Sequence, residues 1–370
     1  MKRAVSILSP AVILLAAFTL IILPDAARAA AADGLTMCYK VIIPSLFPFM
    51  VLASMTVTLG YAAYLGRLLE APMGRFLHLP GACGAALAVG LISGFPVGAK
   101  VAAELYADGE CSRDDAERML GFCSNCGPAF IFGFAGAAVL GSAGAGLILF
   151  IAQTAAALAV AVITRPKAPP VRSGRENTAA AKVPSFGSAF SGAVRGSFGA
   201  VLDICAFVIL FSVLGGLMDS AGITDLICGL LSRLGVNTAV SSALIHGLME
   251  ISAGVRLAGA KGIPAALRLP LTAAVIGWSG VSVHFQVLSV TESCGLRLGH
   301  YLRGKLMTSL LSAFFASLLG RLFTPPAVNA ASGFGVTAVS AECALLLPAV
   351  LIMIGIKSQK GTGKSAQKEV

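Results

Sequence analysis

Apolar stretches long enough to cross a bilayer alternate with short polar segments along most of the chain. A run of about 20 apolar residues is typical of a membrane-spanning helix, whereas a barrel strand shows alternating hydrophobicity over about ten residues. The pattern therefore predicts an all-α polytopic membrane protein. The plainest predicted spans cover residues 1–24, 143–164, 201–218, 306–322 and 338–356.

Four further apolar stretches contain glycine, proline or polar residues that a lipid-facing helix would not carry. Irregular backbone at membrane depth is tolerated only where protein or a water-filled cavity covers it. We therefore predict a discontinuous helix at each of them. They are GLISGFPVGAK at 90–100, FCSNCGPAFIFGFAG at 122–136, ALIHGLMEISAG at 243–254 and IGWSGVSVHFQVLS at 276–289.

Segments that mix charged and apolar residues at helical spacing lie between the apolar stretches. This pattern predicts amphipathic helices at the membrane surface. In one of them Ser112 is followed by Asp115, which is typical of a helix N-terminus. The predicted interfacial segments cover 61–79, 112–118, 185–200 and 223–234.

The order of elements occurs twice and predicts an internal duplication. Gly94 lies 31 residues before Asn125, and Glu250 lies 30 residues before Gly280, with an offset of about 155 between the pairs. The predicted domains are a first helix (1–24), repeat 1 (41–164), a cytoplasmic linker (165–184), repeat 2 (185–323) and a last helix (338–356).

Orientation indicates that the two repeats are inverted. Basic residues mark the N-terminus, the linker and the tail as cytoplasmic, so each repeat crosses an odd number of times. The two repeats are inverted in this way only if the first helix stays uncleaved. A signal peptide that ends near Ala27-Arg28-Ala29 is the alternative, but its apolar run is longer than a usual signal core.

Composition agrees with a membrane protein, because 57% of residues are hydrophobic and 12% are charged, against about 25% charged in soluble domains. The net charge of +10 comes from basic loops and the tail, so we do not expect nucleic acid as a partner. The partner expected from composition is the lipid bilayer. The nine cysteines are predicted to pack as free thiols.

The irregular stretches also carry the candidate binding residues. Broken helices expose N–H groups, and these favour anions. Glycines would let the backbone approach a ligand, and a buried carboxylate such as Glu250 is functional by default. The competing interpretation is close helix packing and satisfied interhelical contacts. The candidates are Ser93, Gly94, Pro96, Gly98, Asn125, Gly127, Glu250, Ser279, His284 and Gln286.

The chemistry predicted for these residues is binding and transport. No metal site, catalytic residue or cofactor is predicted, because the chain contains no HExxH, GxSxG or phosphate-binding loop. Glu250 could bind a coupling ion, H+ or Na+. An intramembrane enzyme is the least favoured alternative.

Several stretches resemble the YlbJ (SpoVV) family of sporulation integral membrane proteins. They occur in the same order over most of the chain, and SGFPVGAK at 93–100 and the region around Gly127-Pro128 are the most specific. The others are IPSLFPFMVLASM at 43–55, HGLMEISAG at 246–254 and GWSGVSVHFQVLS at 277–289.

The resemblance implies a nucleoside-recognition Gate domain and a fold similar to that of concentrative nucleoside transporters. It also implies that a small anionic solute, dipicolinate, moves from the mother cell across the outer forespore membrane. A non-transporting scaffold or sensor, and a transporter of nucleoside-type solutes, are the alternatives. A homo-oligomer is compatible with the resemblance.

Overall fold

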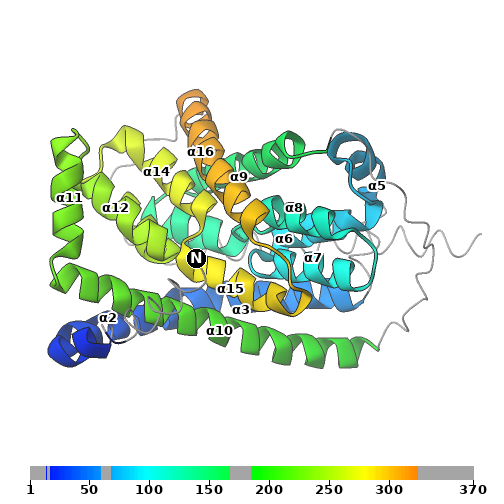
Figure 1. The fold of residues 1–370 in the computed structure, drawn as a ribbon, viewed down its shortest axis with the longest axis horizontal. Helices are drawn as coiled ribbons and strands as arrows, with labels where there is room; N and C mark the ends of the chain where they lie inside the picture. Colours follow the sequence, from blue (N-terminus) through cyan, green and yellow to red (C-terminus); the bar gives the residue numbers. More distant parts are fainter. Residues whose placement is uncertain (1–13, 15–16, 60–67, 167–184, 324–370) are drawn as a thin grey trace, which may run out of the picture.

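The computed structural model describes all residues except 1–13, 15–16, 60–67, 167–184 and 324–370 (Figure 1). Most of the predicted first helix, nearly all of the linker and the whole predicted span 338–356 lie outside the described residues. Within the described part every regular element is a helix, as predicted. Four described helices are long and apolar enough to span a membrane, or five if one bent pair is counted. The chain is thus an all-α, multi-pass membrane protein.

The first described elements form a bent helical unit that packs against α10. α2 continues through a π-helical turn into α3, and the two parts meet at 51°. The alanine-rich segment after Pro24 therefore leads into the next helix. Phe47 of α3 meets Phe198 of α10 edge to face, with ring centroids 6.1 Å apart. The elements are α2 (Pro24–Met37), η1 (Cys38–Ile42) and α3 (Ile43–Thr58).

The described part of the predicted interfacial helix 61–79 is helical from Glu70 to Leu77, with an exposed side and a buried side. It forms the short α5 (Glu70–Pro72) and η2 (Met73–Leu77), and the chain then turns at His78 with φ 51°. Met73 and Leu79 are each only 1% exposed. Apolar residues of this segment therefore join the protein core.

The N-terminal half continues with two helices that are broken where the sequence predicts. One breaks between α6 and α7, and the other between α8 and η4. A capping box of Ser112 and Asp115 starts α8 as predicted. The elements are η3 (Gly81–Cys83), α6 (Gly84–Ser93), α7 (Val97–Ala107), α8 (Arg113–Cys123), η4 (Ala129–Val139) and α9 (Ala143–Ile163).

α8 is buried more deeply than its charged sequence suggested. Every residue from Ala116 to Cys123 is buried, including Glu117 and Arg118. The Arg118 guanidinium donates to the carbonyls of Leu77 at 2.6 Å and Ala161 at 2.8 Å. Charge alone suggested an exposed helix, but these carbonyl and ion-pair partners allow the charges to be buried.

The C-terminal half contains two more broken helices, between α12 and α13 and between α14 and α15. The predicted split of 185–200 from 201–218 is wrong, because α10 is one helix of 35 residues. The elements are α10 (Phe186–Ser220), α11 (Ile223–Arg233), α12 (Thr238–Met249), α13 (Ile251–Ala258), α14 (Ala265–Trp278), α15 (Val281–Thr291), η5 (Glu292–Cys294) and α16 (Gly299–Leu322).

The predicted span 306–322 is too short, because α16 begins at Gly299. Its early turns contain Tyr301 and Lys305, which the hydropathy pattern had left outside the membrane. Both side chains are buried. Two polar side chains of α16 thus lie in the protein interior.

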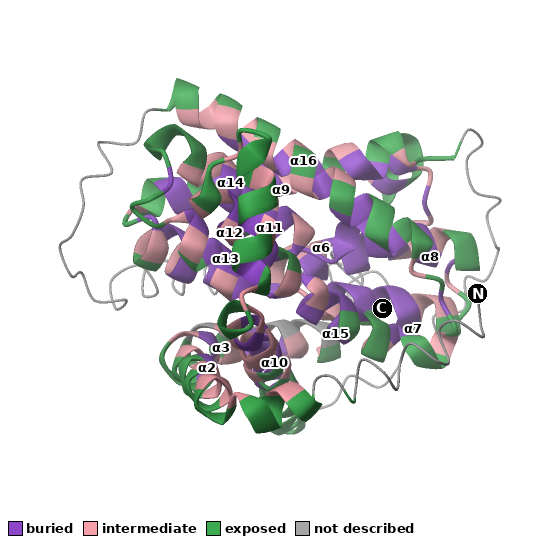
Figure 2. Ribbon diagram, turned by 60° about the vertical axis from the view of Figure 1, so that its left-hand side comes forward, coloured by how far each residue is buried: buried purple, intermediate pink, exposed green. Residues whose placement is uncertain are grey.

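The core lies among the broken helices, whereas the long helices face outward. Figure 2 shows buried residues concentrated in α6, α7 and α8, and a largely exposed α11. Large exposed apolar side chains such as Ile151 on α9, Leu210 on α10 and Leu310 on α16 are expected of lipid-facing helices. The eight described cysteines are free, and seven of them are buried, as predicted.

Candidate functional site

The two broken helices of the N-terminal half cross at their breaks. α6 ends at Ser93, Gly94 follows at φ 80° and ψ −172°, and α7 begins after Pro96, whose bond to Phe95 is cis. A Cβ on Gly94 would lie 2.7 Å from the amide nitrogen of Gly127, which sits in the other break. Glycine is therefore required where the two chains pass. We call this contact of Gly94 and Gly127 the first crossing.

Flanking glycines bring the helices of the first crossing together. A Cβ at Gly90 or at Gly98 would overlap the carbonyl of Cys123, the last residue of α8. Small residues of this kind let helix backbones approach closely in membranes. Gly98 thus has a packing role here, which was the competing interpretation of the glycine pattern.

Side-chain amides stabilise the irregular backbone of the break between α8 and η4. The Asn125 amide donates to the carbonyl of Phe122 at 2.6 Å. Gln153 of α9 accepts from the Cys126 N–H at 3.3 Å and donates to the Cys126 carbonyl at 3.0 Å. A broken helix leaves such groups without partners, so these contacts stabilise the break. Asn125 is therefore engaged by its own loop.

The C-terminal half contains a crossing of the same kind. Ser279 and Gly280 follow α14 with φ 79° and 85°, and a Cβ on Gly280 would lie 3.1 Å from Glu250 Cα. Beside it, a Cβ on Gly254 would overlap Gly247 Cα across the other break. We call the contact of Gly280 and Glu250 the second crossing. It matches the first in having flanking glycines and two interrupted helices.

Glu250 differs from every other candidate because its carboxylate caps a helix. It ends α12 and begins α13, and it is 2% exposed. Its two oxygens accept from the N–H groups of Ser252 at 2.9 Å and Ala253 at 2.8 Å. These N–H groups were expected to face a ligand, but the protein's own carboxylate occupies them. By contrast, α7, η4 and α15 begin with no side-chain cap.

The remaining candidates of the C-terminal half lie near the second crossing. The Ser279 hydroxyl donates to the Ile276 carbonyl at 3.1 Å, so it closes its own helix. Nδ1 of His284 lies 2.8 Å from the Tyr301 hydroxyl. Nε2 of His284 and Oε1 of Gln286 are buried without a hydrogen-bond partner, as is the Ser93 hydroxyl in the other half.

Helices α8 and α16 join the two crossings. A Cβ on Gly304 would lie 2.8 Å from the Gly121 carbonyl carbon, so the two helices pack backbone to backbone. One residue further along α16, the Lys305 ammonium donates to the Ser124 carbonyl at 3.0 Å. A cation from the C-terminal half therefore reaches the first crossing.

Glu117 joins the halves a second time, at the start of the same helices. Its Oε1 accepts from Arg113 Nε at 2.9 Å and from the Arg297 N–H at 3.0 Å. The Arg297 guanidinium lies 3.4 Å from the same oxygen. The carboxylate is 3% exposed, although both arginines are more open.

We expect Glu117→Gln to lower the thermal stability of the protein. It removes the buried charge that both arginines face, a loss of between about 1 and 3 kcal/mol. Glu104→Gln is the matched control, because Glu104 and Lys100 are exposed and 3.9 Å apart, a pair worth less than about 1 kcal/mol. Melting curves in detergent should show a clear drop for the first variant alone. Equal melting temperatures would show that the link does not hold the halves together.

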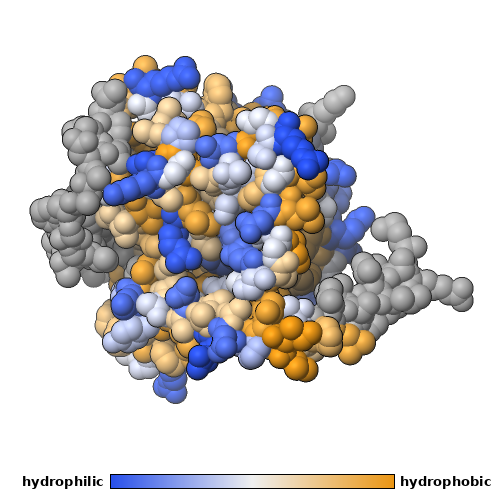
Figure 3. Space-filling view, turned by 90° about the vertical axis from the view of Figure 1, so that its left-hand side faces the viewer, coloured by the Kyte–Doolittle hydropathy of each residue, from blue (hydrophilic) through white to orange (hydrophobic). Residues whose placement is uncertain are grey.

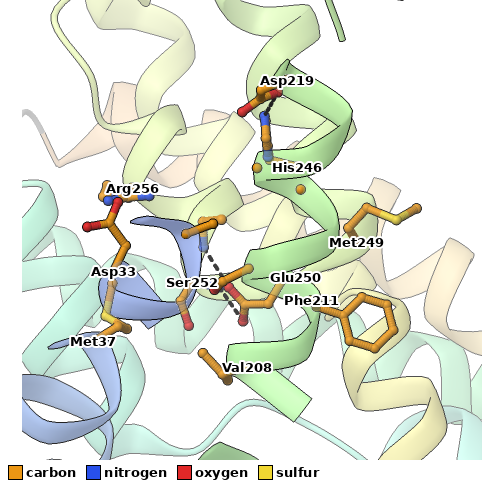
Figure 4. A pocket seen from close by; sticks show the side chains of 15 residues that line it. Asp33, Met37, Val208, Phe211, Asp219, His246, Met249, Glu250, Ser252 and Arg256 are labelled. Atoms are coloured by element: carbon orange, nitrogen blue, oxygen red, sulfur yellow. Dashed lines mark hydrogen bonds and ion pairs between the residues drawn. The ribbon is translucent and has the colours of Figure 1, made fainter. Parts of the chain in front are cut away.

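A cavity borders the second crossing. It has a volume of about 130 Å³ and is lined by residues of α2, α10, α12 and α13, where a single water needs about 10–15 Å³. Its lining includes Asp33, Asp219, His246, Glu250 and Arg256 (Figure 4). Nε2 of His246 lies 3.1 Å from the Asp219 carboxylate. Five ionisable side chains therefore line a cavity next to a broken helix.

A neighbouring cavity shares part of this lining and extends toward α11. Both contain Asp219, His246 and Arg256, and the second adds Thr224 and Asp225. Figure 3 views the end of the molecule that carries α11 and shows polar side chains gathered down the middle of that face. Of the ten predicted site residues, Glu250 alone lines either cavity.

Comparison with known proteins agrees with this architecture. Residues 39–165 match the Gate family model, described as nucleoside recognition. The chain is 29% identical over 323 residues to sporulation integral membrane protein YlbJ of Bacillus subtilis (strain 168), an alignment that covers 81% of this chain and 79% of YlbJ. The chain is therefore similar to the Gate family over residues 39–165 and to YlbJ over most of its length. The resemblance inferred from the sequence is thus confirmed.

The region that matches the Gate model, residues 39–165, contains the whole first crossing and the amides that hold it. Ser93, Gly94, Pro96, Gly98, Asn125 and Gly127 lie in one contiguous region. Glu250, Ser279, His284 and Gln286 lie outside the Gate match, at or near the second crossing.

Sequence reasoning missed the polar face of α16. Tyr301, Lys305, Thr308 and Ser312 are spaced by four, three and four residues, and each is no more than 1% exposed. That spacing places them on one helix face. A polar stripe on an apolar helix points to the interior of a membrane bundle, so this signal could have revealed them.

Proposed function

We propose that the chain is a secondary transporter of a small anionic solute. The observation that supports this best is the pair of crossings, each made of two interrupted helices with flanking glycines. Transporters built from inverted repeats bind their solutes between such helices near the middle of the bilayer. The similar construction of the two crossings supports the proposed duplication of 41–164 and 185–323.

Dipicolinate is the solute we propose, moved from the mother cell across the outer forespore membrane during endospore formation. The similarity to YlbJ, whose name assigns it to sporulation, supports the setting. Dipicolinate is a planar dianion, and the uncapped starts of α7, η4 and α15 offer N–H groups suited to anions. A coupling ion, H+ or Na+, would act at the ionisable cavity beside Glu250.

A nucleoside-type solute is the second candidate, favoured by the description of the Gate model. The test is uptake of labelled dipicolinate into proteoliposomes that contain the full chain, with a pH or Na+ gradient imposed in turn. We expect saturable uptake that unlabelled dipicolinate blocks and uridine does not. Block by uridine would favour the second candidate. No uptake with either solute would favour a scaffold or sensor and would overturn the transport proposal.

A further inference from the structure

Lys305 is a buried cation that faces no carboxylate. It is 1% exposed, on a helix long and apolar enough to span the membrane. Among the residues that the structure describes, none forms an ion pair with it, and the Ser124 carbonyl is its one hydrogen-bond acceptor. An ammonium has three donors, so most of its hydrogen-bonding capacity is unused. A buried charge without a partner is expensive and marks a functional site by default.

The Lys305 side chain lies beside the closest contact of α8 and α16. Gly304 lies against Gly121 so closely that no side chain fits between α16 and α8. Lysines near helix ends usually extend their ammonium to the interface. Here the ammonium instead points to the C-terminal end of α8, where the first crossing interrupts the helix.

A second unpartnered group lies beside the same helix face. Tyr301 precedes Lys305 by one turn of α16, and its hydroxyl lies 2.8 Å from His284 Nδ1. When that hydroxyl donates to Nδ1, the ring proton sits on Nε2. Nε2 is buried without a hydrogen-bond partner, and His284 as a whole is 8% exposed. The region thus offers a charge and a free N–H donor.

Capping of α8 is the alternative explanation for Lys305. A cation at a helix C-terminus is favourable, and the Ser124 carbonyl is one of the groups such a cap would satisfy. A cap uses one donor and leaves the charge unbalanced. It also gives no reason for the free Nε2 of His284. Ligand binding accounts for both.

We propose that Lys305, Tyr301 and His284 form a binding site for the carboxylate group of a small anionic solute. This inference rests on the proposed function in one respect, that the transported solute is an anion. The Lys305 ammonium would balance the solute's charge, and the His284 N–H would donate to a carboxylate oxygen. Tyr301 would position the imidazole. The site lies between the halves, where a solute would contact both.

Trp278 allows the proposal to be tested by binding alone. It is the single tryptophan of the chain, and its ring centroid lies 4.6 Å from that of His284. Pyridine-2,6-dicarboxylate should change its fluorescence saturably in the purified full chain, and the neutral pyridine-2,6-dicarboxamide should not. We expect Lys305→Met to weaken diacid binding by about tenfold or more. Lys100→Met, which alters an exposed lysine, should bind like the wild type.

Two outcomes would overturn the proposal. One is an equal response to the diacid and the diamide, and the other is unchanged affinity in Lys305→Met. If that variant aggregates, Tyr301→Phe carries the test, with an expected loss of about 3- to 10-fold and with unchanged affinity counting against the site. Binding without transport in proteoliposomes would leave this site intact and would refute the transport proposal alone.

Discussion

Gly94→Ala should prevent the first crossing from forming and should abolish transport. The substitution has two effects. The backbone at φ 80° and ψ −172° is a conformation that is essentially restricted to glycine. The new Cβ would also lie 2.7 Å from the amide nitrogen of Gly127. Because that neighbour is backbone, it cannot rotate away, so the two broken helices must move apart.

The matched control for Gly94→Ala is Gly109→Ala. Gly109 also has a positive φ, 75°, but open space surrounds it. A left-handed conformation alone costs roughly 1–2 kcal/mol, so the control should remain folded and active. Both variants would be compared by melting in detergent and by uptake of labelled dipicolinate. If Gly94→Ala behaved like Gly109→Ala, the close crossing of the two breaks would not be required.

Glu250→Gln should lower both thermal stability and transport, whereas Glu250→Asp should preserve them. The carboxylate accepts from two backbone N–H groups, and the amide of glutamine would turn an N–H donor toward one of them. Losing that bond in a buried site costs about 1–3 kcal/mol. Aspartate keeps two acceptor oxygens and is a favoured helix N-cap.

Measurements with and without an ion gradient distinguish a capping role of Glu250 from a role in ion coupling. Melting and uptake would be measured with and without a pH or Na+ gradient, with Glu292→Gln on an exposed residue as the control. If Glu250→Gln were as stable as the wild type but lost its dependence on the gradient, Glu250 would be a coupling residue. If Glu250→Gln lost both thermal stability and uptake, the result would support the role of Glu250 as a helix cap.

The four breaks could be predicted from the sequence because their causes are local. Glycine, proline and a lone carboxylate interrupt apolar stretches at Gly94, Pro128, Glu250 and Gly280, and each lies between two helices. The pairing of the breaks could not be predicted in this way. Gly94 meets Gly127, and Gly280 meets Glu250, through contacts that depend on how whole helices pack.

Burial of charge was the main failure of the sequence reading. Glu117 and Arg118 were expected on an interfacial helix, because charged side chains usually lie at the surface, and Lys305 fell just outside the predicted span 306–322. Their contacts come from distant residues: Arg297 donates to Glu117, Arg118 donates to the Ala161 carbonyl, and Lys305 has the Ser124 carbonyl alone among the described residues. Such partners are separated along the chain by up to 181 residues. The role of Glu250 as a cap could have been predicted, because its partners Ser252 and Ala253 lie only two and three residues further along the chain. It was missed because Glu250 was interpreted as a ligand-binding residue.

The most direct test of the central claim is the initial rate of labelled dipicolinate uptake into proteoliposomes that contain the full chain. We predict saturable uptake by the wild type, uptake reduced by about tenfold or more in Lys305→Met, and normal uptake in Lys100→Met. Wild-type uptake no faster than that of protein-free liposomes, under a pH or a Na+ gradient, would contradict the account of this chain as an anion transporter.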